Sequence, residues 1–555
     1  MHSDSKIITW IGAVLLGLFA AITFISERFT LASPEKERPI LVVFALFTVA
    51  FGVYLFAVRR AVRSSVSVTR IFEFAIAFRV IMLFSTPILE IDVYRYIWDG
   101  NAAAIGVNPY EFSPKQVLEA QDTAPANLRR LSELSKSSPA LQAILETVHF
   151  GQLPSPYPPV SQAVFATSAL LTPNDASIRT HLLVMRTFIV LFDLGTLWLL
   201  VLLLRRLEMP TGWAIAYGWC PLVLKEFANS GHLDSITVFL TVAAAYALVR
   251  GGRLAVVASA ALLAAATAAK FYPLVLLPVF AVAWVRFNAD KPRWARGLAG
   301  VASYVAIGSV LLFPMFTDTS SPEQYVSGEQ NSDGFHAFVR YWEMNDFLFM
   351  LAIENLKPDE LVPPSGADDD GDGLVTASHP GWFVVVPESV RSSVVAKGVS
   401  TYGLPPGEVP FLTARLLTVW IFGCVVLWTC WRLWRQTSAN NFLRACFASV
   451  AWVWLLAPTQ NPWYWTWSLA FIPFAFRREW LWIAGLTMIY YLRFWFEYHY
   501  TDMQVFGTAY QGTDFFDYVV TCIEFGPWFI VFWAGSLWRL RRKPLSRPSV
   551  SESVA

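Results

Sequence analysis

Long apolar runs alternate with shorter polar and basic stretches along most of the 555 residues. A helix that crosses a bilayer needs about 20 mostly apolar residues, and about 14 runs reach or approach that length. The runs near residues 218, 261 and 470 are short or carry charge at one end. The pattern predicts an all-α polytopic membrane protein with spans centred near residues 16, 49, 80, 196, 218, 241, 261, 279, 306, 421, 450, 470, 488 and 528.

Two polar stretches, each roughly 90 residues long, interrupt the apolar runs and exceed the usual length of a connection. Helix-like periodicity within residues 118–145 predicts that the first stretch is folded. The predicted order is three N-terminal transmembrane helices, the first long loop, a middle helical block, the second long loop, a C-terminal helical block and a tail, at residues 1–89, 90–185, 186–315, 316–410, 411–538 and 539–555.

Basic residues recur in every second connection, which predicts the orientation of the chain. Cytoplasmic loops are enriched in Lys and Arg, so these connections are expected in the cytoplasm. Both termini are then cytoplasmic, and the two long loops are extracytoplasmic. The residues concerned are Arg59, Arg60, Arg63, Arg205, Arg206, Arg250, Arg253, Arg286, Lys291, Arg293, Arg296, Arg432, Arg435, Arg444, Arg477, Arg478, Arg539, Arg541, Arg542 and Lys543.

The composition agrees with a membrane protein and narrows the functional classes. Hydrophobic residues make up 55% of the chain and charged residues 15%, whereas a soluble domain has about 25% charged residues. The net charge of +1 gives no sign of a nucleic-acid partner. The sequence has no Walker loop and no dinucleotide-binding motif, which argues against an ATP-driven pump.

The segment 90–110 concentrates ionisable and aromatic residues where an apolar run ends. Glu90 and Asp92 are two residues apart, so in an extended segment their carboxylates point the same way and can converge on one hydroxyl or one cation. A carboxylate at a half-buried membrane edge has a raised proton affinity, which suits a general base. The alternative is a solvated helix end. Arg95, Tyr96 and Asp99 follow in the same segment.

Four further motifs fall on the predicted outer face. They place Tyr157 before two prolines, His232 and Asp234 in N-S-G-H-L-D near Lys225, Lys270 in K-F-Y-P, and Trp463 and Tyr464 in N-P-W-Y-W. Ionisable residues at membrane depth are expensive and favour a functional site. The structural alternatives are a loop-to-helix junction, a core histidine, a snorkelling lysine and an interfacial aromatic belt.

An acidic stretch in the second long loop resembles the start of a calcium loop. Asp368, Asp370 and Asp372 precede Gly373 in the D-x-D-x-D-G order. His379 occupies the twelfth position, where a bidentate Glu is expected, so the loop is incomplete. The two interpretations are a structural calcium site and a solvated acidic loop.

The motifs D-V-Y-R-Y-I-W-D-G, G-V-N-P-Y, Y-P-P, G-H-L-D, K-F-Y-P and N-P-W-Y occur in this order between residues 92 and 464. In this they resemble the GT-C-fold integral-membrane glycosyltransferases, and most closely the polyprenol-phosphate-mannose-dependent mannosyltransferases and their relatives. The resemblance implies a polyprenyl-phosphate sugar donor, a lipid or glycan acceptor whose hydroxyl attacks the anomeric carbon with inversion, and Asp92 as base. The E-x-D of Glu90 and Asp92 replaces the family's frequent D-x-D, which leaves a divalent metal there an open question.

The resemblance also implies positive partners for the departing phosphate, and Lys225, His232, Lys270 and Arg95 are the candidates. We expect a hexosyltransferase, with mannose as the candidate sugar, embedded among the lipids of the bacterial inner (plasma) membrane with its site extracytoplasmic. The alternative is a multi-pass transporter or flippase for a lipid-linked or small polar substrate. Transporters place ionisable groups near the midplane and often contain repeats, whereas here the charges gather at one face.

Overall fold

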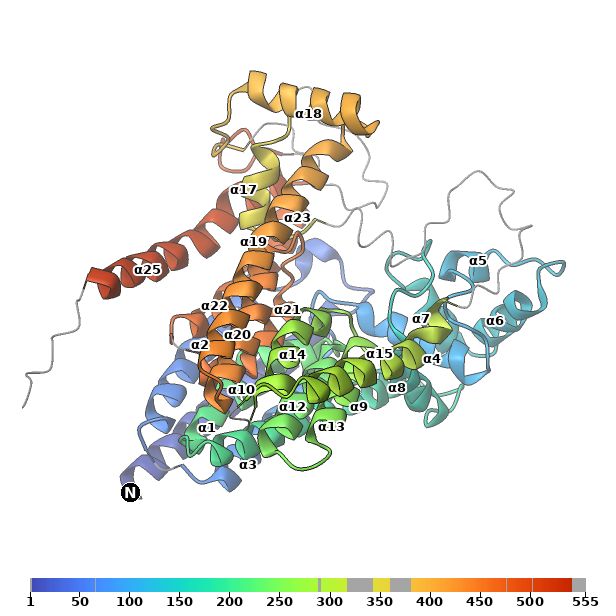
Figure 1. Cartoon of the computed structure of the whole chain (residues 1–555). Helices are drawn as coiled ribbons and strands as arrows, with labels where there is room; N and C mark the ends of the chain where they lie inside the picture. Colours follow the sequence, from blue (N-terminus) through green and yellow to red (C-terminus); the bar gives the residue numbers. More distant parts are fainter. Residues whose placement is uncertain are drawn as a thin grey trace, which may run out of the picture.

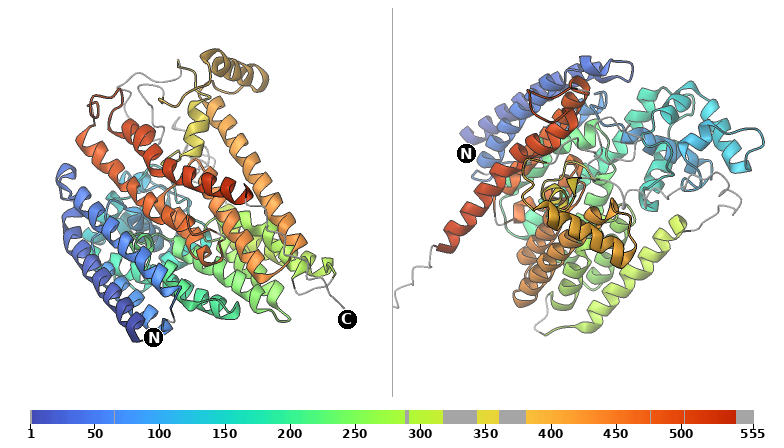
Figure 2. Two further views of the ribbon diagram at one scale, coloured as in Figure 1. Left: turned by 90° about the vertical axis from the view of Figure 1, so that its left-hand side faces the viewer. Right: turned by 90° about the horizontal axis from the view of Figure 1, so that it is seen from above.

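The protein is a helical bundle with a group of short helices attached to one side (Figures 1 and 2). The computed structural model describes residues 2–64, 66–287, 291–316, 343–359, 381–475, 477–501 and 503–541. Within these ranges every named element is helical, and β structure is confined to one bridge between Met344 and Thr459. The predicted all-α class is therefore confirmed.

The first half of the chain begins with three long helices, continues with five short ones and returns to the bundle. The helices are α1 (His2–Ser26), α2 (Ile40–Ala61), α3 (Val68–Leu83), α4 (Asp92–Ala104), α5 (Pro114–Leu118), α6 (Ala126–Lys136), α7 (Pro139–Glu146), α8 (Pro159–Leu170), α9 (Ile178–Arg206), α10 (Ile215–Gly218), α11 (Pro221–Val223), the π-helix η4 (Leu224–Asn229), α12 (Asp234–Arg250), α13 (Ala255–Thr267), α14 (Leu277–Arg286) and α15 (Trp294–Phe316).

The second half adds two long helices, α19 and α25, among shorter ones. Its helices are α17 (Leu348–Glu354), α18 (Glu388–Tyr402), α19 (Glu408–Arg435), α20 (Ala439–Leu456), α21 (Pro462–Leu469), α22 (Trp480–Leu486), α23 (Leu492–His499), α24 (Gly512–Phe515) and α25 (Thr521–Arg541). Short 3-10 helices lie between them and in the first half, namely η1 (Glu27–Phe29), η2 (Glu35–Glu37), η3 (Thr211–Ala214), η5 (Tyr272–Leu276), η8 (Ile472–Phe474) and η9 (Thr487–Tyr491), and η10 (Phe516–Val520) is a π-helix.

Among the described residues, six helices are long and apolar enough to cross a membrane, and a bent pair makes a seventh candidate. The six are Lys6–Phe29, Ile40–Ala61, Ile178–Arg206, Trp294–Phe316, Glu408–Arg435 and Gly512–Leu537. The expected number of about 14 spans is thus not confirmed. Several expected spans are divided into short helices that begin at a proline, as at Pro221 and Pro462, because proline lacks the N–H that a helix interior requires.

The predicted first long loop contains the group α4–α8, drawn in blue and cyan at one side of Figures 1 and 2. The periodicity over 118–145 corresponds to α6 and α7. Ser113 and Gln116 form a capping box that starts α5, and Pro159 occupies the first turn of α8. Helices α4 and α8 pack closely against each other. The segment is therefore a folded block, as the periodicity predicted.

Gly100 permits the close contact between α4 and α8. A Cβ added there would lie 2.6 Å from the carbonyl carbon of Phe165. We therefore expect Gly100→Ala to destabilise the protein by about 1–3 kcal/mol, the usual cost of overpacking. Thermal unfolding of the detergent-solubilised protein measures the change. The control is Gly52→Ala in α2, where an added Cβ meets no described atom within 4 Å, and an equal loss in both variants would contradict the explanation.

A buried ion pair joins three helices inside the bundle. Arg79 of α3 pairs with Asp193 of α9, and both side chains are fully buried. The Arg79 Nη1 also donates to the carbonyl of Gly218 at the end of α10 over 2.8 Å, and the Tyr217 hydroxyl donates to Asp193 over 2.8 Å. Every polar group in this network has a partner, as the cost of burying charge requires.

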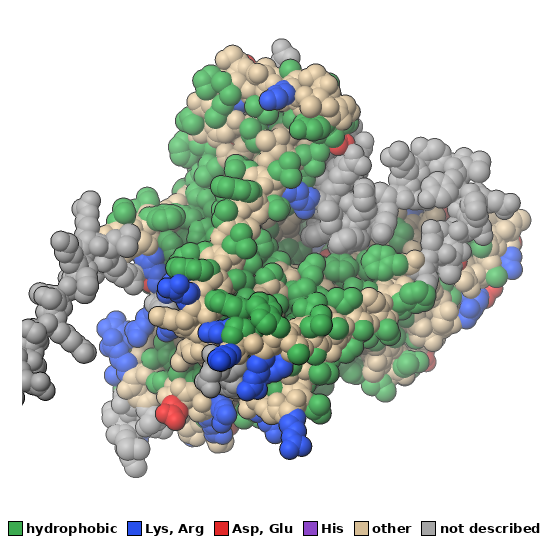
Figure 3. All heavy atoms as spheres, in the orientation of Figure 1, with side chains coloured by type: hydrophobic (Ala, Val, Ile, Leu, Met, Phe, Trp, Pro, Cys, Tyr) green, Lys and Arg blue, Asp and Glu red, His purple; other side chains and the backbone are tan. Residues whose placement is uncertain are grey.

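The surface carries a broad apolar band. In Figure 3 hydrophobic side chains cover much of the middle of the molecule, while Lys and Arg side chains gather toward its lower edge. Exposed large hydrophobics such as Leu298, Val310 and Trp420 lie on α15 and α19. Water disfavours contiguous apolar surface of this extent, whereas lipid accepts it. The surface therefore agrees with an integral membrane protein.

Candidate functional site

A sharp bend within residues 221–250 brings together four ionisable residues, Lys225, Glu226, His232 and Asp234. The helix direction bends by 120° between η4 and α12, across a break of a few residues. Gly231 lies in the break with a φ of +75°, and a Cβ there would lie 2.8 Å from the Arg186 side chain. The Asn229 amide donates to Ser85 Oγ and to the Thr86 carbonyl, both over 2.7 Å. The bend is therefore anchored to the segment that leads to α4.

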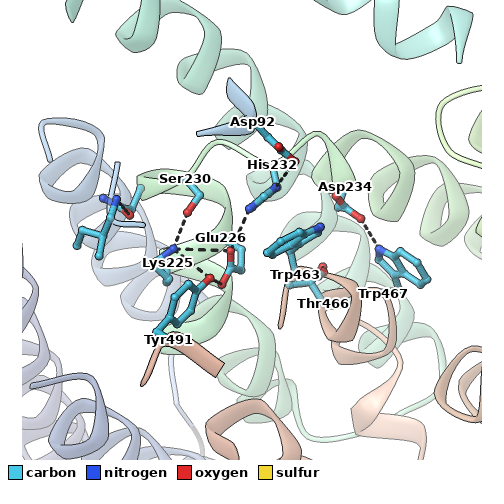
Figure 4. A network of polar contacts seen from close by, with 12 residues as sticks. Asp92, Lys225, Glu226, Ser230, His232, Asp234, Trp463, Thr466, Trp467 and Tyr491 are labelled. Carbon is cyan, nitrogen blue, oxygen red and sulfur yellow. Dashed lines mark hydrogen bonds and ion pairs between the residues drawn. The ribbon is translucent and has the colours of Figure 1, made fainter. Parts of the chain in front are cut away.

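Asp92, His232 and Glu226 lie in a row at this bend (Figure 4). Asp92 is the first residue of α4, and its side chain is 33% exposed. Its Oδ2 lies 3.9 Å from Nδ1 of His232, whose Nε2 lies 3.3 Å from Oε2 of Glu226. His232 is fully buried and stacks on Trp463 with a centroid distance of 4.2 Å. An exposed carboxylate is thus backed by a buried imidazole and a buried carboxylate.

Lys225 and Tyr491 complete one side of the row. The Tyr491 hydroxyl donates to Glu226 Oε1 over 2.6 Å, and Lys225 Nζ donates to the Tyr491 oxygen over 3.1 Å and to Ser230 Oγ over 2.6 Å. Glu226, Ser230 and Tyr491 were not among the site residues predicted from the sequence. Glu226 could have been found, because it adjoins Lys225 in an apolar run and paired charges at membrane depth are rare. Tyr491 gave no local signal.

Asp234 and Lys270 form a second ion pair on the other side of His232. Lys270 Nζ donates to both Asp234 oxygens, over 2.8 and 2.9 Å, and the Trp467 indole donates to the same carboxylate. Trp467 is stacked between Tyr272 and Tyr464, with centroid distances of 3.9 and 4.5 Å. The predicted motifs containing Asp234, Lys270 and Tyr464 therefore meet in space.

Tyr157 precedes α8, whose first turn is hydrogen-bonded to the segment before Lys270. The Val160 N–H donates to the Ala268 carbonyl over 2.9 Å, and Ser161 Oγ donates to the Ala269 carbonyl over 2.8 Å. Burial raises the pKa of Tyr157 well above its usual value, and the negative charge of Asp92 raises it further. The tyrosine is therefore neutral and lies within electrostatic range of Asp92.

Arg95, Tyr96 and Asp99 face the interior of the α4–α8 block. Arg95 Nη2 donates to the carbonyls of Phe150 and Leu153 over 3.0 and 2.9 Å. The Asp99 carboxylate accepts from Ser155 and from Gln162, and Tyr96 stacks on Phe165 at 4.7 Å. Burial raises the pKa of Asp99, although Arg95 and these two donors oppose the shift. The contacts of these residues hold the block together, and a substrate role for them stays a prediction.

Glu90 differs from Asp92 in its surroundings. It is only 8% exposed, and its Oε1 has no hydrogen-bond partner among the described residues. Burial raises the pKa of the Glu90 carboxyl well above its ordinary value, and Lys225 lowers it only in part. Burial thus favours the neutral form of this carboxyl, which weakens it as a metal ligand because ligating carboxylates are ionised.

The metal predictions stay untested. In the part of the chain that the structure describes, no group of three or more His, Cys, Asp or Glu side chains could hold a metal ion. Glu90 and Asp92 alone would supply two oxygen ligands. The calcium prediction for Asp368, Asp370 and Asp372 lies outside the described residues.

A narrow apolar pocket of about 10 Å³ adjoins the site on the Lys225 side. Residues of α2, of the segment before Glu90 and of η9 enclose it, and Lys225 and Tyr491 are its polar lining. The lining residues are Phe29, Ile40, Val43, Phe44, Phe47, Ile88, Leu89, Lys225, Met488 and Tyr491. The apolar pocket therefore ends at the Lys225 ammonium, which pairs with Glu226.

Comparison with known proteins gives one match. Residues 5–286 match the family described as "Alpha-(1->6)-mannopyranosyltransferase, N-terminal domain". Neither the curated proteins nor the solved structures gave a match. The matched region covers more than half of the 555 residues and includes Asp92, His232 and Lys270. The expected glycosyltransferase activity is confirmed, and the transporter or flippase alternative loses its support. The chain belongs to the alpha-(1->6)-mannopyranosyltransferase family, whose members are membrane glycosyltransferases of the GT-C type.

Proposed function

We propose that the protein transfers mannose from a polyprenyl-phosphate donor to a hydroxyl of a lipid or glycan acceptor, with inversion at the anomeric carbon. The observation that carries the proposal is the position of Asp92. This partly exposed carboxylate is linked through His232 and Glu226 to Lys225, which lines an apolar cavity. A lipid-borne sugar phosphate has a matching arrangement: its anomeric carbon would lie near Asp92, its phosphate near Lys225 and its apolar tail toward the pocket.

The cavity supports a lipid-phosphate donor. Its lining is almost wholly apolar, which is the chemistry that suits an isoprenoid chain, and at about 10 Å³ the pocket would have to widen to admit one. An ammonium group has three hydrogen-bond donors, and Lys225 uses two of them on Ser230 and Tyr491. The third can donate to a phosphate oxygen. Of the four predicted phosphate partners, Lys225 is the one that lines this cavity, whereas Lys270 is paired with Asp234 and Arg95 with backbone carbonyls.

Asp92 supplies the base in this mechanism. Its carboxylate accepts the proton of the acceptor hydroxyl as the oxygen bonds to the anomeric carbon and the bond to the phosphate breaks. His232, with Glu226 behind it, borders that carboxylate at 3.9 Å. Because a single displacement inverts the configuration, an alpha product requires a donor with a beta sugar–phosphate bond. The alpha-(1->6) linkage in the family's name makes a 6-hydroxyl the acceptor group that we propose.

The two ends of α2 support an extracytoplasmic site. The cavity is lined by Ile40 and Val43 at the start of α2, and Arg59 and Arg60 lie in its last turn. The 22 residues of α2 separate these ends by about 33 Å at the helical rise. The positive-inside rule then assigns the arginine end to the cytoplasm. We accordingly propose cytoplasmic termini and a site on the outer side of the bacterial inner membrane.

A turnover assay tests the proposed function. The purified full-length protein in nanodiscs is incubated with polyprenyl-phosphate mannose, glucose and arabinose and with a short alpha-mannoside acceptor. We expect transfer from the mannose donor to the 6-hydroxyl, with an alpha linkage identified by NMR of the product. Transfer from another donor, or a beta-linked product, would contradict the proposal.

Lys225→Met is expected to raise the KM for the lipid donor about 10- to 100-fold, because it removes one charge-assisted hydrogen bond to the phosphate. The KM for the acceptor should change little. Lys115→Met on α5 is the control, since that side chain is exposed and lies away from the cavity. An unchanged donor KM in a folded Lys225→Met variant would remove Lys225 from the phosphate site.

A further inference from the structure

The site has two sides, separated by His232 and Trp463. Figure 4 shows Lys225, Glu226 and Tyr491 on one side of the stacked pair and Asp234 with Trp467 on the other. The bend between η4 and α12 produces this arrangement, because Lys225 and Glu226 precede it and Asp234 follows it. The apolar cavity lies on the Lys225 side. The residues of the Asp234 side have no role in the mechanism proposed above.

The opposite side holds an ammonium group in a fixed place. Lys270 bonds both oxygens of the buried Asp234, and its Nζ lies 4.3 Å from the ring centroid of Tyr464 and 5.5 Å from that of Trp467. Asp234 is fully buried, whereas the Lys270 side chain remains 19% exposed. A long lysine side chain is rarely so restrained by accident, since immobilising it costs rotamer entropy. The exposed member of the cluster is therefore the cation.

Aromatic rings surround this ammonium. Tyr272, Trp467 and Tyr464 form a continuous stack. The edge of such a stack offers apolar surface to the C–H groups of a pyranose, and an ammonium donates to its hydroxyls. The chemistry of the cluster suits a neutral sugar ring.

We propose that Lys270, held by Asp234 against Tyr464 and Trp467, forms the binding subsite for the acceptor sugar, a pyranose of a glycan or glycolipid. The proposal rests on the proposed function, because it takes the donor phosphate to bind on the Lys225 side. In an inverting displacement the nucleophile enters opposite to the leaving group. With the phosphate on one side of Asp92 and His232, the acceptor hydroxyl must approach from the other, where Lys270 lies.

Comparison of transfer with donor hydrolysis separates acceptor binding from donor binding. Lys270→Gln keeps a hydrogen-bond donor for Asp234 but removes the charge. With polyprenyl-phosphate mannose as donor and methyl alpha-D-mannopyranoside as acceptor, we expect the acceptor KM to rise about tenfold, the usual cost of one lost charge-assisted hydrogen bond. The donor KM and the rate of donor hydrolysis by water should stay within twofold of the wild type, which also shows that the variant is folded.

The donor is the second possible source of a pyranose, and the same assay detects it. If the donor KM and the hydrolysis rate change with the acceptor KM, the subsite belongs to the donor sugar and the proposal is overturned. Tyr464→Leu provides a second variant that leaves the ion pair intact, and the same selective rise in acceptor KM is expected. An unchanged acceptor KM in either folded variant also overturns the proposal.

A binding measurement distinguishes failure of the subsite from failure of the proposed function. Saturation-transfer NMR with methyl alpha-D-mannopyranoside alone needs no donor and no turnover. If the wild-type protein binds this sugar and Lys270→Gln does not, the subsite stands even if polyprenyl-phosphate mannose proves not to be the donor. Equal binding by both proteins would overturn the subsite while leaving the donor proposal intact.

Discussion

Asp92→Asn is expected to lower mannosyl transfer by about 10²- to 10⁴-fold, the usual contribution of a general base. The amide preserves the shape of the side chain but cannot accept the proton of the acceptor hydroxyl. Because the Asp92 side chain is 33% exposed, the protein should remain folded. Transfer by the purified variant in nanodiscs, with thermal unfolding as the measure of folding, checks this expectation.

Glu90→Gln is the matched control for this variant. Burial raises the pKa of the Glu90 carboxyl and favours its neutral form, so a neutral amide of the same shape should leave transfer within a few-fold of the wild type. If Glu90→Gln were as inactive as Asp92→Asn, the two residues would act as a pair, as the E-x-D motif allows. Full activity of Asp92→Asn would remove Asp92 from the role of base.

Arg79→Met is expected to destabilise the protein by about 3–5 kcal/mol, the usual cost of removing one partner of a buried ion pair. The substitution leaves Asp193 fully buried and without its counter-charge, and it removes the hydrogen bond to the Gly218 carbonyl. Because α3, α9 and α10 meet at this point, the loss should appear in the unfolding of the whole bundle. Thermal unfolding in detergent measures it.

Two further variants test the explanation by ion pairing. Arg70→Met on the same helix removes an exposed guanidinium that pairs with the exposed Glu73, and such pairs contribute at most about 1 kcal/mol. The double variant Arg79→Met with Asp193→Leu removes both buried charges and should recover part of the stability. Equal destabilisation by Arg70→Met, or no recovery in the double variant, would show that the buried pair is not the cause.

The helical class and the helices α6 and α7 within residues 118–145 could be predicted because both depend on local periodicity. The length of the apolar runs identified α2, α9 and α19, each of which is a single unbroken helix. The same measure failed around residues 218 and 470, because it counts apolar residues and disregards the prolines that end helices there. Pro221, Pro462 and Pro473 would have indicated broken helices, although not how the pieces pack.

The candidate site was predictable in its residue types and not in its pairings. Asp92, His232, Asp234 and Lys270 stood out because ionisable groups at a membrane edge are costly. Their partners come from distant segments, as when Tyr491 bonds Glu226 or Trp467 bonds Asp234. Such contacts depend on helix packing, for which a single sequence carries no periodic signal. The apolar cavity was unpredictable for the same reason.

The sharp bend between η4 and α12 has a consequence for the evolution of substrate choice. Lys225 and Asp234 stand on one short stretch of backbone, and that stretch is fixed by Gly231 and Asn229. An insertion or deletion in this stretch would displace Lys225, the proposed partner of the donor phosphate, together with Asp234, which holds Lys270 at the proposed acceptor subsite. Relatives that exchange one reactant while keeping the other should therefore vary in α2, α21 or η9, which approach the bend from outside, and preserve the length of the bend itself.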